Sequence, residues 1–163
     1  MNLLKKEFDL NNFTHSDTAK RKNIDNTPLE EHEVELKKLH TLLSEIQSRL
    51  STKLGKYTDI NINSGYRSPK LNAAIPGSSS TSQHSLGQAA DTFAIGVPRE
   101  QYYQYIKALV KAKIIEVGQV IMEYGKNPES EVDDWVHISL PTQKFKNQFM
   151  IKEQGKPYRK DLS

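Results

Sequence analysis

The sequence predicts an α+β fold in which helices pack on one face of a small antiparallel sheet. Two observations favour this class. A long amphipathic helix pattern comes first, and the short strand patterns that follow it are interrupted by a second helix pattern. The length of 163 residues suits one domain with its own hydrophobic core. We therefore expect residues 1–26 to form a polar N-terminal arm and residues 27–163 to form a single domain.

The first helix is expected to begin near Thr27. Thr27 can accept a capping hydrogen bond, Pro28 suits the first helical position, and Glu30 completes a capping box. Apolar residues at helical spacing then predict one face that packs on the core: Leu39, Leu42 or Leu43, Ile46 and Leu50.

The other elements follow along the chain. Strand patterns cover residues 59–63, 89–95, 116–124 and 134–140. A short helix is expected over 70–75, a long helix over 97–114, and a turn over 125–133. Residues 141–163 carry a concentration of Lys and Arg, and this run is predicted to be a solvated basic tail.

Composition excludes several kinds of site. The chain has no cysteine, so disulfides and thiolate metal sites are excluded, and a metal would need His and carboxylate ligands. The net charge of +3 is mild and no nucleic-acid-binding motif is recognisable, so we expect no nucleic-acid partner. No window approaches the about 18 apolar residues of a membrane span, and no secretory signal is recognisable. Because no heptad pattern is present, we expect a monomer.

Two histidines lie at the edges of predicted strands in the middle of the domain. His84 precedes Asp91 and a predicted strand, and His137 lies within the last strand. Two imidazoles and one carboxylate would form a three-ligand zinc site that leaves a fourth position open for water. Spacing alone leaves open the alternative that both histidines are ordinary core or loop residues. His32 and His40, on the first helix, are expected to be surface or packing residues.

The sequence around His84 carries a more specific pattern. The stretch SQHSLGQAAD has the form Ser-x-His-x-x-Gly-x-Ala-x-Asp, and it lies between SGYRSPKLN and a later Asp-Trp-x-His. In this order, over residues 60–140, these elements strongly resemble the zinc D-alanyl-D-alanine carboxypeptidase family, the vanY-like peptidoglycan metallopeptidases. Hedgehog signalling domains share that fold. The stretch FTHSDTAKRKNIDNTP more loosely resembles the lead-in of small members encoded by phages and prophages.

The resemblance implies that residues 60–140 form a metal-site core in which His84, Asp91 and His137 bind Zn²⁺. It further implies that Asp134 is the general base, which takes a proton from the metal-activated water. Strand geometry leaves Asp133 as an alternative base. In one regular strand Asp133 and His137 would share a face, and Asp134 would point away.

Two more residues acquire roles from the resemblance. Arg67 is expected to contact the substrate beside the metal, where a guanidinium suits a developing oxyanion. Ser82 is expected to bind substrate by a hydrogen bond or only to shape its loop, and the serine run before it is expected to be a flexible lip of the cleft.

The resemblance implies hydrolysis of peptide bonds in peptidoglycan stem peptides, most directly as a D-Ala-D-Ala carboxypeptidase. Two alternatives remain: an endopeptidase lysin that cuts within the stem, and a catalytically inactive zinc protein of the same fold that binds cell wall. We expect synthesis in the cytoplasm and action on the cell wall or periplasm, after phage-mediated release or as part of a virion.

Overall fold

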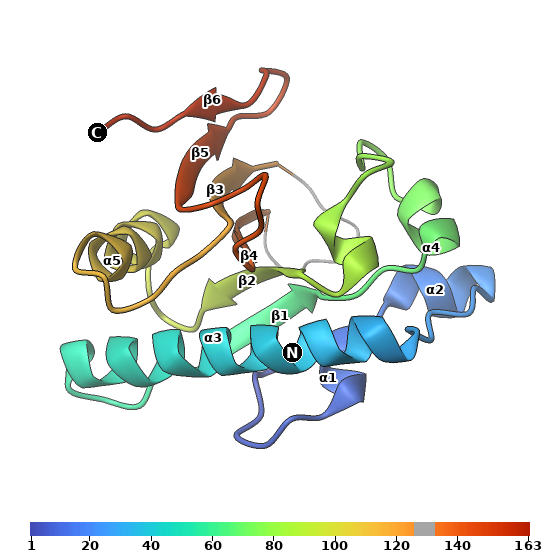
Figure 1. The fold of residues 1–163 in the computed structure, drawn as a ribbon, viewed down its shortest axis with the longest axis horizontal. Helices are drawn as coiled ribbons and strands as arrows, with labels where there is room; N and C mark the ends of the chain where they lie inside the picture. The colour runs from blue at the N-terminus through green and yellow to red at the C-terminus, as the bar shows by residue number, and fades with distance from the viewer. Residues whose placement is uncertain (126–132) are drawn as a thin grey trace.

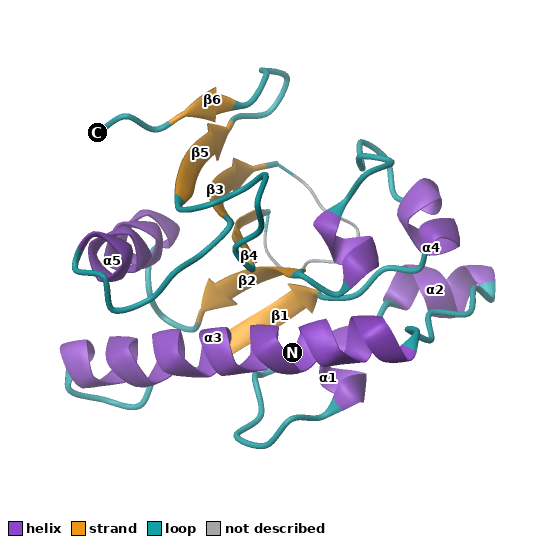
Figure 2. Cartoon of the chain, viewed as in Figure 1, coloured by secondary structure: helices purple, strands orange, loops and turns teal. Residues whose placement is uncertain are grey.

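The structure is a computed structural model that describes residues 1–125 and 133–163. The expected turn over 125–133 therefore lies almost entirely outside the described residues. Figure 1 shows the chain in order and Figure 2 its helices and strands. The helices are α1 (Leu10–Thr14), α2 (Asp17–Lys22), α3 (Glu30–Leu54), α4 (Pro69–Ala74), the 3₁₀ helix η1 (Gln83–Leu86) and α5 (Arg99–Lys111). The strands are β1 (Ile60–Ser64), β2 (Ala89–Ala94), β3 (Gln119–Tyr124), β4 (Asp134–Ser139), β5 (Gln148–Lys152) and β6 (Arg159–Lys160).

The strands form one six-stranded sheet in the order β1-β2-β4-β3-β5-β6. Every neighbouring pair is antiparallel except β3 and β5, which run parallel. The predicted α+β class with a mainly antiparallel sheet is thus confirmed. The parallel pair comes from a segment that the sequence predicted to be a tail.

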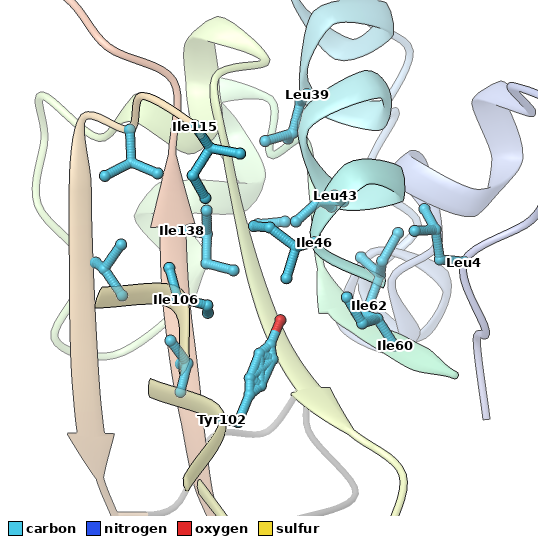
Figure 3. Packing of buried hydrophobic residues seen from close by; sticks show 14 of the residues in the cluster. Leu4, Leu39, Leu43, Ile46, Ile60, Ile62, Tyr102, Ile106, Ile115 and Ile138 are labelled. Atoms are coloured by element: carbon cyan, nitrogen blue, oxygen red, sulfur yellow. The ribbon is translucent and has the colours of Figure 1, made fainter. Parts of the chain in front are cut away.

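Period-two alternation divides the sheet into a core face and an opposite face. Ile60 and Ile62 of β1 and Ile138 of β4 point into the core, where α3 and α5 cover them. Figure 3 shows Leu39, Leu43 and Ile46 of α3 and Tyr102 and Ile106 of α5 converging on these strands. The two long helices, α3 and α5, therefore cover the same face of the sheet, and neither of them covers the opposite face. None of the described helices is long and apolar enough to cross a lipid bilayer.

The start of α3 differs from the expected capping box. Leu29 occupies the N-cap position and makes no side-chain cap hydrogen bond. The backbone N–H and the hydroxyl of Thr27 both donate to Asp25 Oδ1, at 2.9 and 2.7 Å. Thr27 is thus held in a turn with Asp25, and the helix begins three residues later, at Glu30.

The N-terminal arm lies against the sheet beside β1. Leu4 N–H donates to Ile60 O at 2.8 Å, and Ile62 N–H donates to Asn2 O at 2.9 Å. Phe13 in α1 is fully buried in the core, and its carbonyl accepts a hydrogen bond from Tyr66 N–H at 2.7 Å. The arm is therefore part of the packed domain.

Residues 141–163 add two strands to the sheet. The basic tail expected from the charge pattern instead contains β5 and β6, which lie at the far end of the sheet from β1 (Figure 1). A buried ion pair anchors the segment to α5: Lys107 Nζ lies 3.0 Å from Asp161 Oδ2, which also accepts from Tyr103 Oη at 2.8 Å. A lysine that is 5% exposed needs such a partner, so the anchor is specific.

Candidate metal centre

Three predicted ligands meet at one point of the structure. His84 lies in η1, Asp91 on β2 and His137 on β4, and all three are buried. One ligand atom from each residue lies within 4.8 Å of the others. Asp91 Oδ1 is 3.3 Å from His84 Nε2 and 3.1 Å from His137 Nδ1. Asp91 and His137 are partners in the β2–β4 ladder, so the sheet fixes two of the three ligands directly.

The short helix η1 fixes the third ligand, and Gly87 ends it. Gly87 has a φ of 73°, and a Cβ at this position would lie 2.5 Å from His32 O on α3. Only glycine can bring the loop this close to α3. His84 Nδ1–H donates to Gly65 O at 2.7 Å, which directs Nε2 toward Asp91. Metal-binding histidines are commonly oriented by such a hydrogen bond from the other ring nitrogen.

The site holds His84 and Asp91 in the ionisation states that a metal needs. Burial, reinforced by the positive charge of Arg67, lowers the pKa of His84 to about 4, so its imidazole is neutral at neutral pH. Burial opposes ionisation of Asp91, but His84, His137 and Arg67 outweigh it and hold its pKa well below its usual range. Neutral imidazole and ionised carboxylate are the forms that bind divalent metals.

Arg67 holds the candidate ligand Asp91 in place. Its Nη2 donates to Asp91 Oδ2 at 2.9 Å, and its Nε donates to Ser64 Oγ at 2.9 Å. The side chain is buried and lines the cleft. The guanidinium therefore orients the ligand carboxylate while one side of it borders the space where a substrate would lie.

A cleft of about 500 Å³ opens over the three ligands. This volume suits a small-molecule or peptide ligand. The serine-rich run forms one of its walls, as expected for a lip, and Asn72 Nδ2 on α4 donates to Ser79 O at 2.6 Å. Ser82 also lines the cleft, but its hydroxyl accepts the His84 N–H at 3.2 Å and caps η1. Ser82 thus has a demonstrated part in shaping the loop.

The structure does not bring Asp134 to the three ligands, and this differs from the placement that the family resemblance implies. Asp134 begins β4 and lies three residues from His137, so the two side chains point to opposite faces. Its carboxylate lies 3.1 Å from Arg99 Nη1, and its side chain is 46% exposed. Asp133, the alternative, precedes the strand and is exposed. Neither residue lines the cleft.

Among the described residues, Glu123 on β3 is the acidic residue besides the candidate ligand Asp91 that lines the cleft, and it was not among the residues expected from the sequence. It is paired with Trp135 across the β3–β4 ladder, so His137 is its diagonal neighbour on the same face. Diagonal neighbours lie about 7–8 Å apart, within reach of a long side chain. Burial, with repulsion from Asp91, raises the pKa of Glu123 to about 7. The feature of the sequence that could have identified Glu123 is its position as a glutamate in an otherwise apolar strand pattern, on the same face as Ile121.

The donor set fits zinc. Two imidazoles and a carboxylate are common zinc ligands, and the bonds from His84 to Gly65 and from Asp91 to Arg67 supply the outer contacts that fix such ligands. Among the residues that the structure describes, these three form the one group of three His, Asp or Glu side chains whose ligand atoms converge in this way.

Comparison with known proteins places these residues in context. A family model described as Peptidase M15 matches residues 6–139, a span that contains all three ligands, Arg67 and Glu123. Neither the comparison with curated proteins nor the comparison with solved structures returned a significant match.

Proposed function

Because the chain belongs to the peptidase M15 family of zinc metallopeptidases, we propose that it hydrolyses peptide bonds in peptidoglycan stem peptides. The observation that carries the proposal is the buried group of His84, Asp91 and His137 beneath a cleft of peptide size. Family membership supports peptide hydrolysis. The resemblance of SQHSLGQAAD and its neighbours to vanY-like enzymes supports peptidoglycan as the substrate.

The ligand group is proposed to bind one zinc ion. His84 Nε2, His137 Nδ1 and the Asp91 carboxylate would hold it, since these atoms already converge. When bound, zinc would polarise the scissile carbonyl and lower the pKa of an attacking water to about 7. Arg67 would keep Asp91 oriented, and it would stabilise negative charge on the carbonyl oxygen from its side of the cleft. Ser82 would border the substrate and maintain the η1 turn.

Glu123 is proposed as the general base in place of Asp134. Its carboxylate would accept a proton from the attacking water and later donate it to the leaving amine. In the metal-free protein, burial and the charge of Asp91 raise the pKa of Glu123 to about 7, and the burial that favours its protonated form stays when a metal binds. A carboxyl group whose protonated form is favoured in this way suits both the uptake and the release of a proton. Asp134 lies on the other face of β4, where Arg99 neutralises it.

The proposed place of action is the cell wall or periplasm. The looser resemblance of the N-terminal stretch to phage-encoded members supports synthesis in the cytoplasm, followed by phage-mediated release or incorporation into a virion. Immunodetection in purified virions and in lysates before and after membrane permeabilisation would test this. Protein in the medium of cells with intact membranes would contradict it.

Digestion of whole peptidoglycan and of a D-Ala-D-Ala-terminated pentapeptide, followed by mass spectrometry, tests the function. Loss of one alanine would identify a carboxypeptidase, and release of larger fragments would identify an endopeptidase. Either activity should disappear on metal removal, return with added zinc, and be absent in His137→Ala. If zinc binds at this site and neither substrate is cut, the chain is a binding protein of the same fold and the peptidase proposal is wrong.

A further inference from the structure

The C-terminal hairpin, defined as residues 148–160 with β5 and β6, forms a wall of the cleft. In the parallel β3–β5 pair, Lys152 lies beside Glu123 and Met150 lies beside Ile121. Residues paired in this way point to the same face of a sheet, and all four side chains line the cleft. The hairpin lies beyond residue 139, where the family match ends. This wall thus lies outside the matched segment.

Lys152 places a positive charge on this wall. Its Nζ donates to the backbone carbonyls of Glu153, at 3.1 Å, and Lys156. An ammonium group has three donors, so one stays available to a ligand. Within residues 1–125 and 133–163, no carboxylate lies within ion-pair distance of Lys152, and the carboxylate of Glu123 beside it interacts with its charge only at longer range. The adjacent Glu153 is paired instead with Lys156 and Arg159.

Tyr158 supplies a second donor on the same wall. The residue is 51% exposed, it lines the cleft, and its ring lies 5.6 Å from Lys152 Nζ. Partial burial, with the negative charges of Glu123 and Asp91, raises the pKa of Tyr158 to about 12. The phenol therefore keeps its proton at neutral pH. Lys152 and Tyr158 together offer donors and no basic acceptor, which is the chemistry that binds a carboxylate.

Distance along the sheet determines where that carboxylate would lie on a substrate. Neighbouring strands are about 4.8 Å apart, so the backbones of β4 and β5 are separated by about 10 Å across β3. Lys152 pairs with Glu123 and His137 with Ile121, so Lys152 also lies two residues, about 7 Å, further along the strands, and the two backbones are about 12 Å apart. An extended peptide advances about 3.3 Å per residue, so a backbone carboxylate bound at Lys152 is about three to four residues from the bond held over His137. An acidic side chain that reaches Lys152 can belong to a residue closer to that bond.

We propose that Lys152 and Tyr158 form a carboxylate-binding subsite that selects stem peptides by an acidic group beyond the residue next to the cleaved bond. The inference rests on the proposed peptidase function. It favours cleavage within the stem over removal of a single terminal residue, because a carboxylate one residue from the cleaved bond would fall short of Lys152.

Kinetics with matched peptides test the subsite. The substrates are a stem peptide, its C-terminal amide, a peptide whose acidic side chains are amides, and the doubly amidated peptide. Lys152→Met should lower kcat/KM about 10- to 100-fold more on the peptide that carries the recognised carboxylate than on its amide, mainly through KM, because any effect of the lost charge on Glu123 is shared by both peptides. Tyr158→Phe should have a smaller effect with the same selectivity. If C-terminal amidation alone abolishes the difference between wild type and variant, the recognised carboxylate is the terminal one. If amidation of the acidic side chains alone abolishes it, the recognised carboxylate belongs to a side chain.

Lys156→Met is the matched control, since it removes one charge from the same hairpin at a side chain that is 68% exposed and does not line the cleft. An equal loss on all four peptides, or no loss, in Lys152→Met would overturn the subsite. If the wild type cuts no peptide, the peptidase proposal fails separately. Calorimetric titration of the same intact peptides then decides the subsite: tighter binding of the acid than of the amide, lost in Lys152→Met, supports it, and equal binding refutes it.

Discussion

Replacement of Glu123 by glutamine separates the base assigned by geometry from the one expected from family spacing. Glutamine keeps the size of the side chain but cannot accept a proton. General base catalysis contributes about 10²- to 10⁴-fold, so kcat should fall by that factor, which corresponds to about 3–5 kcal/mol of lost transition-state stabilisation. Zinc content should stay at the wild-type level, because Glu123 is not one of the three converging ligands.

Asp134→Asn is the matched comparison. It removes a carboxylate that is paired with Arg99 on the other face of β4 and is 46% exposed. Such a pair contributes about 0–1 kcal/mol to stability, so we expect nearly unchanged hydrolysis and a small change in the free energy of unfolding. Initial rates on the peptide found to be cut, with zinc measured in each sample, provide the assay. A large loss in Asp134→Asn together with an active Glu123→Gln would refute the geometric reasoning.

The same Glu123 substitution has a second, independent readout in the metal-free protein. Burial and Asp91 raise the pKa of Glu123 to about 7 from 4.5. The group therefore leaves stability unchanged below about pH 4.5, lowers it progressively between about pH 4.5 and 7, and has its full effect above about pH 7. Glu123→Gln should therefore stabilise the metal-free protein at pH 8, by up to about 3 kcal/mol, and should leave it unchanged at pH 4. Urea unfolding at both pH values measures this. An equal effect at both would show that Glu123 titrates normally.

Three further substitutions test the framework around the centre. Gly87→Ala should lower the free energy of unfolding by about 1–3 kcal/mol, because a Cβ in this left-handed turn would lie 2.5 Å from His32 O. Thermal unfolding measures the change, and Gly77→Ala is the control, because Gly77 is also left-handed but has open space around it. An equal loss in both variants would show that the contact with His32 does not matter. Arg67→Met should weaken zinc binding about 10- to 100-fold by freeing Asp91, as measured by competition with a chromophoric chelator, and unchanged affinity would exclude an orienting role. Burial opposes ionisation of Asp161, but hydrogen bonds from Ser163, Tyr103 and Lys107 hold its pKa well below its usual range. Asp161→Asn should therefore destabilise the protein by about 3–5 kcal/mol at pH 7, a difference that shrinks below about pH 4, and a pH-independent difference in urea unfolding would contradict this.

The candidate ligands were predictable because the sequence pattern that carries them is largely local. His84, Gly87 and Asp91 lie within one short stretch that fixes a turn and the start of a strand, and strand alternation gives the face of His137. The proposed base, Glu123, was not predictable in the same way. Alternation already indicated that Asp134 would point away from His137, but the neighbour of β4 in the sheet depends on tertiary pairing, and only that pairing brings Glu123 beside His137.

The C-terminal hairpin shows a second limit of local patterns. β5 and β6 are short and contain Lys and Arg, and β5 pairs in parallel with β3, which precedes β4 in the sequence. Charge composition therefore indicated a solvated tail. The long-range contacts that oppose that reading, including Lys107 with Asp161, cannot be seen in the spacing of residues.

The pairing of the N-terminal arm with β1 bears on how the molecule behaves at high concentration. A bare edge strand presents unsatisfied N–H and C=O groups that can template pairing with another chain. Residues 2–4 occupy those groups on β1, and at the opposite border the two-residue β6 carries the charges of Arg159 and Lys160. Both borders of the sheet are thus poor templates for a growing aggregate. Removing residues 1–4 should leave the ligand group intact and make the protein self-associate through β1.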